Sequence, residues 1–314
     1  MHVLFLKPYI MQRFHIVLLL VMSLICRPFQ SHAQSPNPLT AKIEQIIKAY
    51  DAKVGVAVHN QEFTEHHFVN KDHKYPMQSV FKFHLGIAVL NQVDSGKLRL
   101  DQDVVITKAD VSNELYSPIR EKFPNGTTMP LSQVLHHTIA QSDNVGCNVL
   151  FRMLGGPDQV QAYFEKQGYT GIAIRNDESE IQGDWEVQFK NWIDIETSNK
   201  ILYDYYTNDK QQLSESSYQF LWDTMRGTST GRDRIKGLLP AGTVVAHKTG
   251  YSGQNKKTKE IAAVNDIGVV TLPNDKVFYI TVLVTDAKEP EPNCAKIIAE
   301  VAKAAYDHYA NQPL

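Results

Sequence analysis

Hydrophobic positions near the two ends of the chain follow the periods of strands and of the helices that flank them. TAKIEQIIKAY at 40–50 has apolar residues at helical spacing, and KVGVAVHN at 53–60 alternates as a strand does. Three further strand-like segments come late in the chain: TVVAHKTG (243–250), DIGVVTL (266–272) and VFYITVLVTD (277–286). A last helical pattern covers about 292–309. The chain ends therefore predict strands accompanied by helices.

The middle of the chain is predicted to be almost entirely helical. Helical patterns cover 79–95, 131–154 with a break at QSDN, 158–167, 197–206 and 213–226. Residues 171–192 have no clear period and are predicted to form a long loop, which inside a compact domain is usually functional. This order of elements predicts an α+β fold. An antiparallel sheet, built from both chain ends and flanked by helices, would carry an inserted all-helical domain.

The same order predicts the limits of the domains. Residues 34–70 and 226–314 would form the α/β part, and residues 71–225 the helical part. Residues 1–33 have the pattern of a signal peptide, with a basic residue, the apolar run HIVLLLVMSLIC and cleavage expected after Ala33. The run is too short to span a bilayer comfortably. We therefore expect an exported, periplasmic protein without stable membrane association.

Two details of this leader stay open. Translation starting at Met11 instead of Met1 would give a more compact basic-then-apolar leader. A lipid anchor on Cys26 is an alternative to cleavage after Ala33, although a bulky isoleucine precedes that cysteine.

Composition and charge narrow the class of protein. With 43% hydrophobic and 21% charged residues in 314, the chain has enough apolar mass for a sizeable core. Its net charge of −2 gives no electrostatic reason to bind nucleic acid or an acidic membrane surface. We expect a monomer. Cys147 and Cys294 lie in apolar, helix-like segments, where two buried free thiols are favoured over a disulfide.

One lysine, Lys82, interrupts the apolar segment VFKFHLGIAVL at 80–90, and Ser79 lies three residues before it. Residues i and i+3 share one face of a helix, with Cβ atoms about 5–6 Å apart, so the two side chains can touch. A serine hydroxyl is a poor nucleophile unless a base takes its proton. A lysine desolvated in an apolar pocket favours its neutral, basic form. The alternative is that Lys82 snorkels or pairs with a carboxylate.

Two further motifs follow this pair in the chain. Ser-Asp-Asn at 142–144 lies about 60 residues on, where a helical pattern breaks, and Lys-Thr-Gly at 248–250 ends a strand-like segment about 100 residues further. In this order and spacing, the three motifs resemble those of the class A serine β-lactamases. The resemblance covers essentially the whole mature chain. Tyr116, between the first two motifs, resembles the tyrosine at the mouth of that family's pocket.

The resemblance implies chemical roles for the first motifs. Ser79 would attack the carbonyl carbon of a β-lactam, while Lys82 and Ser142 shuttle protons. The backbone N–H groups of Ser79 and Tyr251 would form an oxyanion hole, where one donor contributes about 3–4 kcal/mol in serine enzymes. No cofactor is implied.

The resemblance also implies a substrate-binding set. The amide side chain of the substrate would contact Asn144, and its carboxylate would face Lys248 and Thr249. The other residues implied to line the substrate site are Tyr116, Gly250, Tyr251 and Ser252.

The long loop departs from the family pattern. The family's deacylating glutamate lies in Glu-x-x-Leu-Asn, and here Glu178 and Gln182 keep the spacing, with isoleucine for leucine and glutamine for asparagine. Glu178 is therefore implied to activate the hydrolytic water and Gln182 to hold it, whereas Glu180 fails the spacing. The alternative for Glu178 is a solvated loop charge. Asn176 and Asn191 stand where the family often has an Arg–Asp pair, which leaves the fold of the loop open.

The strand after Lys-Thr-Gly lacks the arginine that many members use to hold the substrate carboxylate. Arg234 is the predicted substitute, because a guanidinium binds a carboxylate with two hydrogen bonds, and Arg232 is second choice. These features resemble the extended-spectrum branch that includes the PER and VEB enzymes. Tyr251 is unusually bulky for its place there, which could change the substrate range.

Two related classes remain as alternatives to a lactamase. A penicillin-binding D,D-peptidase and a drug-sensing acyl receptor share the three motifs but lack the loop base, so Glu178 discriminates among all three. A metal enzyme is not expected. Among the twelve histidines, the pairs at 66–67 and 136–137 are adjacent and do not face one way, and no metal-binding spacing occurs. His84 is interpreted as a core histidine.

Overall fold

The computed structural model describes residues 37–112 and 114–311. The predicted signal peptide, with its possible start at Met11, Cys26 and the expected cleavage after Ala33, lies outside the described residues. Among the helices of the described residues, none is long and apolar enough to cross a membrane.

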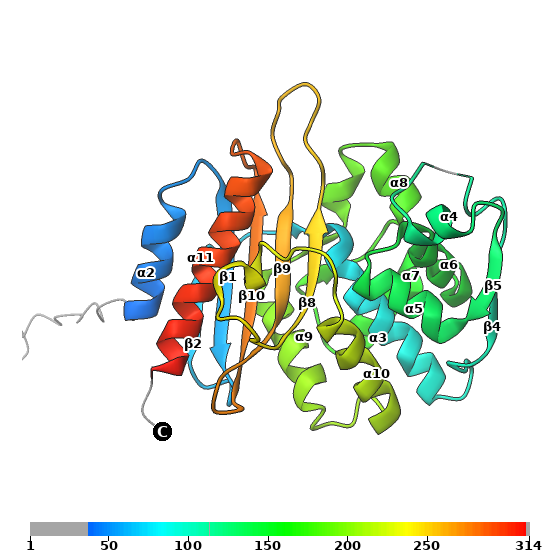
Figure 1. Cartoon of the computed structure of the whole chain (residues 1–314), viewed down its shortest axis with the longest axis horizontal. Helices are drawn as coiled ribbons and strands as arrows, with labels where there is room; N and C mark the ends of the chain where they lie inside the picture. The colour runs from blue at the N-terminus through cyan, green and yellow to red at the C-terminus, as the bar shows by residue number, and fades with distance from the viewer. Residues whose placement is uncertain (1–36, 113, 312–314) are drawn as a thin grey trace, which may run out of the picture. The chain divides into compact units, whose positions relative to one another are not determined.

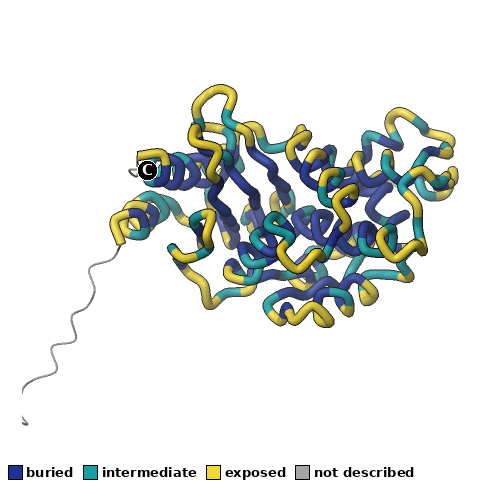
Figure 2. The backbone as a smooth tube through the Cα atoms, turned by 90° about the horizontal axis from the view of Figure 1, so that it is seen from below, coloured by how far each residue is buried: buried dark blue, intermediate teal, exposed yellow. Residues whose placement is uncertain are grey.

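A five-stranded antiparallel sheet is built from both ends of the chain, as predicted. Its strand order is β2-β1-β10-β9-β8 (Figure 1). The strands are β1 (Lys53–Asn60), β2 (His66–Val69), β8 (Val245–Tyr251), β9 (Val264–Thr271) and β10 (Val277–Thr285). All nine residues of β10 are buried, because helices cover both faces of the sheet (Figure 2). The predicted α+β fold is confirmed.

Alternate residues of the strands pack into two different cores. Val56 and Val282 face one side with α2 (Pro38–Ile47) and α11 (Glu291–Ala310), whereas their neighbours Ala57 and Leu283 face the other. On that second side, α9 (Ile195–Thr207) packs on the sheet and donates from the Asn199 amide to the Ala57 carbonyl over 3.0 Å. Strands β1 and β10 therefore contribute apolar side chains to both cores.

The helices of the middle surround α3 (Phe81–Asp94), in which residues 81–90 are all buried. The others are α4 (Pro118–Lys122), α5 (Leu131–Ala140), α6 (Asn144–Leu154), α7 (Pro157–Lys166) and α10 (Glu215–Arg226). A helix that is apolar all round belongs in a core, which places α3 at the centre of this part of the fold (Figure 1). The predicted free thiols are confirmed, since Cys147 and Cys294 are unpaired and buried.

Several short elements were not predicted. The expectation of a structureless loop at 171–192 is wrong, because it holds β6 (Ile172–Ala173), α8 (Glu178–Gly183) and η2 (Val187–Lys190). The strands β3 (Tyr75–Pro76) and β7 (Trp192–Ile193) join β6 in a small sheet that closes the ends of this loop. The hairpin of β4 (Asp103–Ile106) and β5 (Thr127–Pro130) also interrupts the predicted run of helices. The remaining element is η3 (Ile235–Leu238).

Candidate active site

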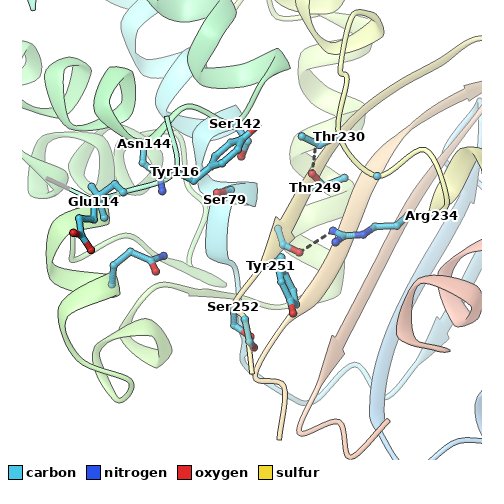
Figure 3. A pocket seen from close by; sticks show the side chains of 15 residues that line it. Ser79, Glu114, Tyr116, Ser142, Asn144, Thr230, Arg234, Thr249, Tyr251 and Ser252 are labelled. Atoms are coloured by element: carbon cyan, nitrogen blue, oxygen red, sulfur yellow. Dashed lines mark hydrogen bonds between the residues drawn. The ribbon is translucent and has the colours of Figure 1, made fainter. Parts of the chain in front are cut away.

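A pocket of about 640 Å³ lies between the edge strand β8 and the helical part (Figure 3). The predicted site residues that line it are Ser79, Tyr116, Ser142, Asn144, Gln182, Arg234, Thr249, Gly250, Tyr251 and Ser252. The other three, Lys82, Lys248 and Glu178, are almost fully buried beside it. Segments far apart in the sequence thus meet at one cavity.

Ser79 lies in the single turn η1 (Gln78–Val80) that leads directly into α3, and Lys82 lies in the first turn of α3. The Lys82 amine donates to Ser79 Oγ over 2.9 Å, the contact that the spacing predicts. It also contacts the Ser142 carbonyl oxygen at 3.0 Å and Asn144 Oδ1. The prediction of an apolar surrounding is wrong: Lys82 is fully buried, but its amine lies among oxygen atoms.

Glu178 is the first residue of α8, and its side chain is only 1% exposed. Its Oε1 lies 2.8 Å from Lys82 Nζ and 3.4 Å from Ser79 Oγ. Glu180 has a different position. It is exposed, and its carboxylate accepts from the backbone N–H of Asp177 over 3.0 Å in a capping box that begins α8. The helix therefore directs one glutamate to the serine and uses the other to cap its own end.

The neck of this loop is held by an amide. Asn191 Oδ1 accepts from the backbone N–H groups of Arg175 (2.8 Å) and Asn176 (3.0 Å), and its Nδ2 donates to the Asn176 carbonyl (2.8 Å). A second tie joins the loop to the serine turn, since Gln78 Nε2 donates to Gln188 Oε1 over 2.6 Å. Hydrogen bonds to the backbone therefore take the place of an ion pair.

Ser142 has a positive φ of 59°, which bends the chain between α5 and α6 and is uncommon for a residue with a Cβ. The bend is held by Asp143, a residue for which no role was predicted. Its carboxylate caps α6 by accepting from the Gly146 N–H (2.8 Å) and also accepts from Ser117 Oγ (2.8 Å). The sequence does indicate this role, because an aspartate at the start of a helical pattern is a typical N-cap. Asp143 thereby fixes the segment of Tyr116 against that of Ser142.

Strand β8 provides the other wall of the pocket. Lys248 is fully buried and donates to Ser142 Oγ over 3.0 Å. Burial, followed by the nearby charge of Lys82, holds the pKa of Lys248 well below the usual value of a lysine. A Cβ on Gly250 would lie 2.5 Å from the Met77 carbonyl oxygen, so the glycine is what allows β8 to approach the serine turn.

Thr230 was not predicted as a site residue. It lines the pocket, and its Oγ1 lies 2.6 Å from Thr249 Oγ1 (Figure 3). Each hydroxyl has one donor hydrogen, and one of the two is used in this contact, so the pair has one donor left for an anion near Lys248.

Arg234 lies behind β8 and reaches the pocket from that side (Figure 3). Its Nη1 donates to the carbonyl oxygens of Gly250 (2.9 Å) and Asn265 (3.0 Å), and its Nη2 contacts Glu291 at 3.3 Å. Tyr251 is 40% exposed at the pocket. Partial burial, and then the Glu291 carboxylate, raises the pKa of the Tyr251 phenol. The guanidinium of Arg234 is thus fixed in position by two carbonyl oxygens and by the partly exposed carboxylate of Glu291.

Comparisons with known proteins find relatives of this chain by sequence and by structure. A sequence profile of the Beta-lactamase enzyme family matches residues 38–309. The chain is 43% identical to beta-lactamase VEB-1 of Pseudomonas aeruginosa, over 94% of this chain and 98% of VEB-1. It is 41% identical to the extended-spectrum beta-lactamase PER-1 of the same organism, over 88% of this chain and 89% of PER-1. The crystal structure of a beta-lactamase from Chitinophaga pinensis superimposes with a TM-score of 0.84 at 40% identity, over 87% of this chain and all of that one.

Proposed function

Because this chain belongs to the beta-lactamase enzyme family and is a class A serine β-lactamase, we propose that it hydrolyses penicillins and cephalosporins, extended-spectrum cephalosporins included, through an ester formed on Ser79. The proposed catalytic roles rest on one observation. The amine of Lys82 lies between Ser79 Oγ (2.9 Å) and Glu178 Oε1 (2.8 Å), beside a pocket of about 640 Å³. A nucleophile, a proton carrier and a second base are therefore in mutual contact.

Acylation uses the first two of these groups. Ser79 Oγ attacks the lactam carbonyl carbon while Lys82 Nζ takes the hydroxyl proton. Lys82 must be neutral at that moment, and Glu178 is close enough to hold the proton that it releases. The oxyanion that forms would be stabilised by the backbone N–H groups of Ser79 and Tyr251.

Cleavage of the lactam C–N bond needs a proton on the leaving nitrogen. The Ser142 hydroxyl supplies it. Lys248 contacts Ser142 Oγ at 3.0 Å and Lys82 contacts the carbonyl oxygen of the same residue at 3.0 Å, so both amines lie near enough to return a proton. This arrangement gives Ser142 the role of a relay between the lysines and the substrate.

The substrate carboxylate is held at the edge of β8. The Thr230 and Thr249 hydroxyls lie next to each other, Lys248 on β8 supplies positive charge beside Ser142, and Arg234 supplies it from behind the strand. A bound carboxylate would favour the charged form of Lys248, which burial disfavours. Asn144 keeps Oδ1 on Lys82 and presents its amide to the acyl side chain.

Deacylation distinguishes a lactamase from the two alternative classes. Glu178 first returns its proton to Lys82 and then takes one from water, whose oxygen attacks the ester carbonyl carbon, with Gln182 at the pocket wall helping to hold that water. The bond from the carbonyl carbon to Ser79 Oγ then breaks, Oγ takes up the proton from Glu178, and the hydrolysed acid leaves. A penicillin-binding D,D-peptidase or an acyl receptor would lack this base. The buried position of Glu178 beside Ser79 supports turnover over a persistent acyl-enzyme.

Room for large acyl side chains supports the extended range. A second cavity of about 600 Å³ shares Gln182 and Ser252 with the catalytic pocket and continues along the loop. PER-1, a relative of this chain, is named an extended-spectrum enzyme. Tyr251, exposed beside the pocket, would then contact the substrate and adjust the preference among cephalosporins.

The remaining expectations concern the protein in the cell. We propose a periplasmic monomer that acts on small β-lactams without a cofactor or nucleic acid. The α/β part would comprise residues 34–70 and 226–314, and the helical part residues 71–225. Within that division α9 is exceptional, because it packs on the sheet although its sequence lies in the helical part.

The nucleophile is tested by Ser79→Ala. This variant should lose nitrocefin hydrolysis and all covalent labelling by penicillin, because no other group replaces Oγ. Intact-mass spectrometry measures the adduct directly. A penicilloyl adduct on the folded Ser79→Ala protein would show that another residue is the nucleophile.

A further inference from the structure

Three potential metal ligands meet at the edge of the sheet that is opposite to the catalytic pocket. They are Glu65, which immediately precedes β2, His67 on β2 and His308 near the end of α11. Their ligand atoms all lie within 4.8 Å of one another. Strand β2 is four strands away from β8, which corresponds to roughly 19 Å at about 4.8 Å per strand. The cluster is therefore separate from the reaction site.

Both imidazoles are directed at one carboxylate oxygen. His67 Nε2 and His308 Nε2 each lie 2.9 Å from Glu65 Oε1, and the Asn37 amide is 3.5 Å from the same atom. In a tetrahedral zinc site with bonds of about 2.0–2.2 Å, ligand atoms stand roughly 3.3–3.5 Å apart. The two separations of 2.9 Å from Glu65 would need to increase by about 0.5 Å. The two histidine ligand atoms lie within 4.8 Å of each other.

The other nitrogen of His67 has a partner that suits metal binding. His67 Nδ1 lies 3.0 Å from Thr40 Oγ1 on α2. A hydroxyl can accept as well as donate, so Thr40 permits the tautomer in which Nδ1 is protonated and Nε2 presents its lone pair. Thr40 therefore holds the ring so that Nε2 can face a metal ion.

We propose that Glu65, His67 and His308 form a site for a divalent transition metal, with Zn²⁺ as the expected ion and water as fourth ligand. Two imidazoles and one carboxylate are a ligand set that zinc uses, whereas Mg²⁺ and Ca²⁺ require oxygen ligands. The side chains of Glu65 and His308 are 27% and 22% exposed, which allows an ion and water to reach the cluster. The role is structural, since the ion would join α11 to β2, two elements that lie side by side (Figure 1).

This site could not be seen in the sequence. His66 and His67 were considered as a pair, but they point to opposite faces of β2. The actual partner of His67 is His308, which the fold brings from the other end of the chain. Only the antiparallel sheet and the last helix on its face place the two rings together.

The test is zinc binding by the full protein, purified without a polyhistidine tag and stripped with chelator. Calorimetric titration with Zn²⁺ should give one saturable site. At about a hundredfold excess over Kd, Tm should rise by roughly 5–10 °C, while Mg²⁺ and Ca²⁺ leave it unchanged. Absence of saturable zinc binding by the wild type would overturn the proposal.

Matched variants locate the site. His308→Gln and Glu65→Gln should each abolish the zinc-induced rise in Tm while retaining nitrocefin hydrolysis, which verifies that they fold. His66→Gln removes an exposed histidine next to the cluster and should bind as the wild type does. Zinc binding that is unchanged in both His308→Gln and Glu65→Gln, or lost in His66→Gln, would contradict the assignment.

Discussion

Replacement of Glu178 by glutamine separates the two halves of the reaction. The amide keeps the volume of the side chain and can still accept from Lys82, but it cannot take a proton from water. Acylation should persist, because Lys82 Nζ still lies 2.9 Å from Ser79 Oγ and can take its proton. Deacylation should fail for lack of a base.

The size of the effect follows from the role. A positioned general base contributes typically 10²–10⁴-fold, or about 3–5 kcal/mol of barrier. Glu178→Ala would add a structural cost, since it removes one partner of a buried ion pair, a change that typically destabilises by about 3–5 kcal/mol. Glutamine also removes the charge, but it keeps the side-chain volume and can still accept a hydrogen bond from Lys82, so it leaves no cavity and is the better probe of chemistry.

Rapid-quench intact-mass spectrometry after mixing with penicillin is the direct assay. The Glu178→Gln protein should carry a stoichiometric adduct on Ser79 that disappears 10²–10⁴ times more slowly than in the wild type. Steady-state turnover should fall by the same factor, and the protein would then behave as an acyl receptor does.

Glu180→Gln is the matched control on the same helix. Its carboxylate caps α8 and is exposed, so its loss should weaken the cap by about 1 kcal/mol and change turnover by no more than a few-fold. If Glu180→Gln accumulates the adduct and Glu178→Gln does not, the assignment of the base is wrong by two residues.

Three further outcomes are expected. Arg234→Ala should raise KM for penicillins about 10–100-fold, because it removes a charged hydrogen bond of about 1.5–3 kcal/mol. Arg232→Ala should have little effect. If Arg234→Ala changes KM by less than twofold, Lys248 alone binds the substrate carboxylate. Asn191→Ala leaves two backbone N–H groups without their acceptor, so it should lower Tm and slow deacylation more than acylation. Single-turnover mass spectrometry measures the two steps separately. Equal effects on both steps would show that Asn191 does not act by positioning Glu178 through the loop. EDTA should leave nitrocefin turnover unchanged if Ser79 is the nucleophile, as proposed, and a large loss restored by zinc would refute this.

The main sheet and the long helices could be predicted because their signals are local. The segment at 53–60 alternates, and β1 has those limits. The short strands β3, β6 and β7 have two residues each and no period of their own, so only pairing across the fold defines them. Helix α8 is similarly brief, and it is stabilised by its capping box and by the burial of Ile181.

The same distinction applies to the site. The contact between Ser79 and Lys82 is predictable because residues three apart on a helix are neighbours. The other oxygens around Lys82 belong to Ser142, Asn144 and Glu178, which only the tertiary fold brings to the amine. Thr230 could not be predicted from the sequence for the same reason, since its contact with Thr249 depends on where the fold places β8.

The two buried lysines of the pocket are in unequal electrostatic positions. Lys82 has the Glu178 carboxylate at 2.8 Å, whereas among the described residues no carboxylate pairs with Lys248, whose amine contacts only Ser142 Oγ and the Thr249 carbonyl oxygen. The pKa of Lys248 is lowered for this reason, by burial first and by Lys82 second. In the proposed reaction an anionic substrate would place a carboxylate beside Lys248, and protonation of Lys248 would be coupled to its binding. Burial of this lysine without a paired carboxylate would then favour the complex over the resting enzyme, and the negative charge of a β-lactam would be part of its recognition.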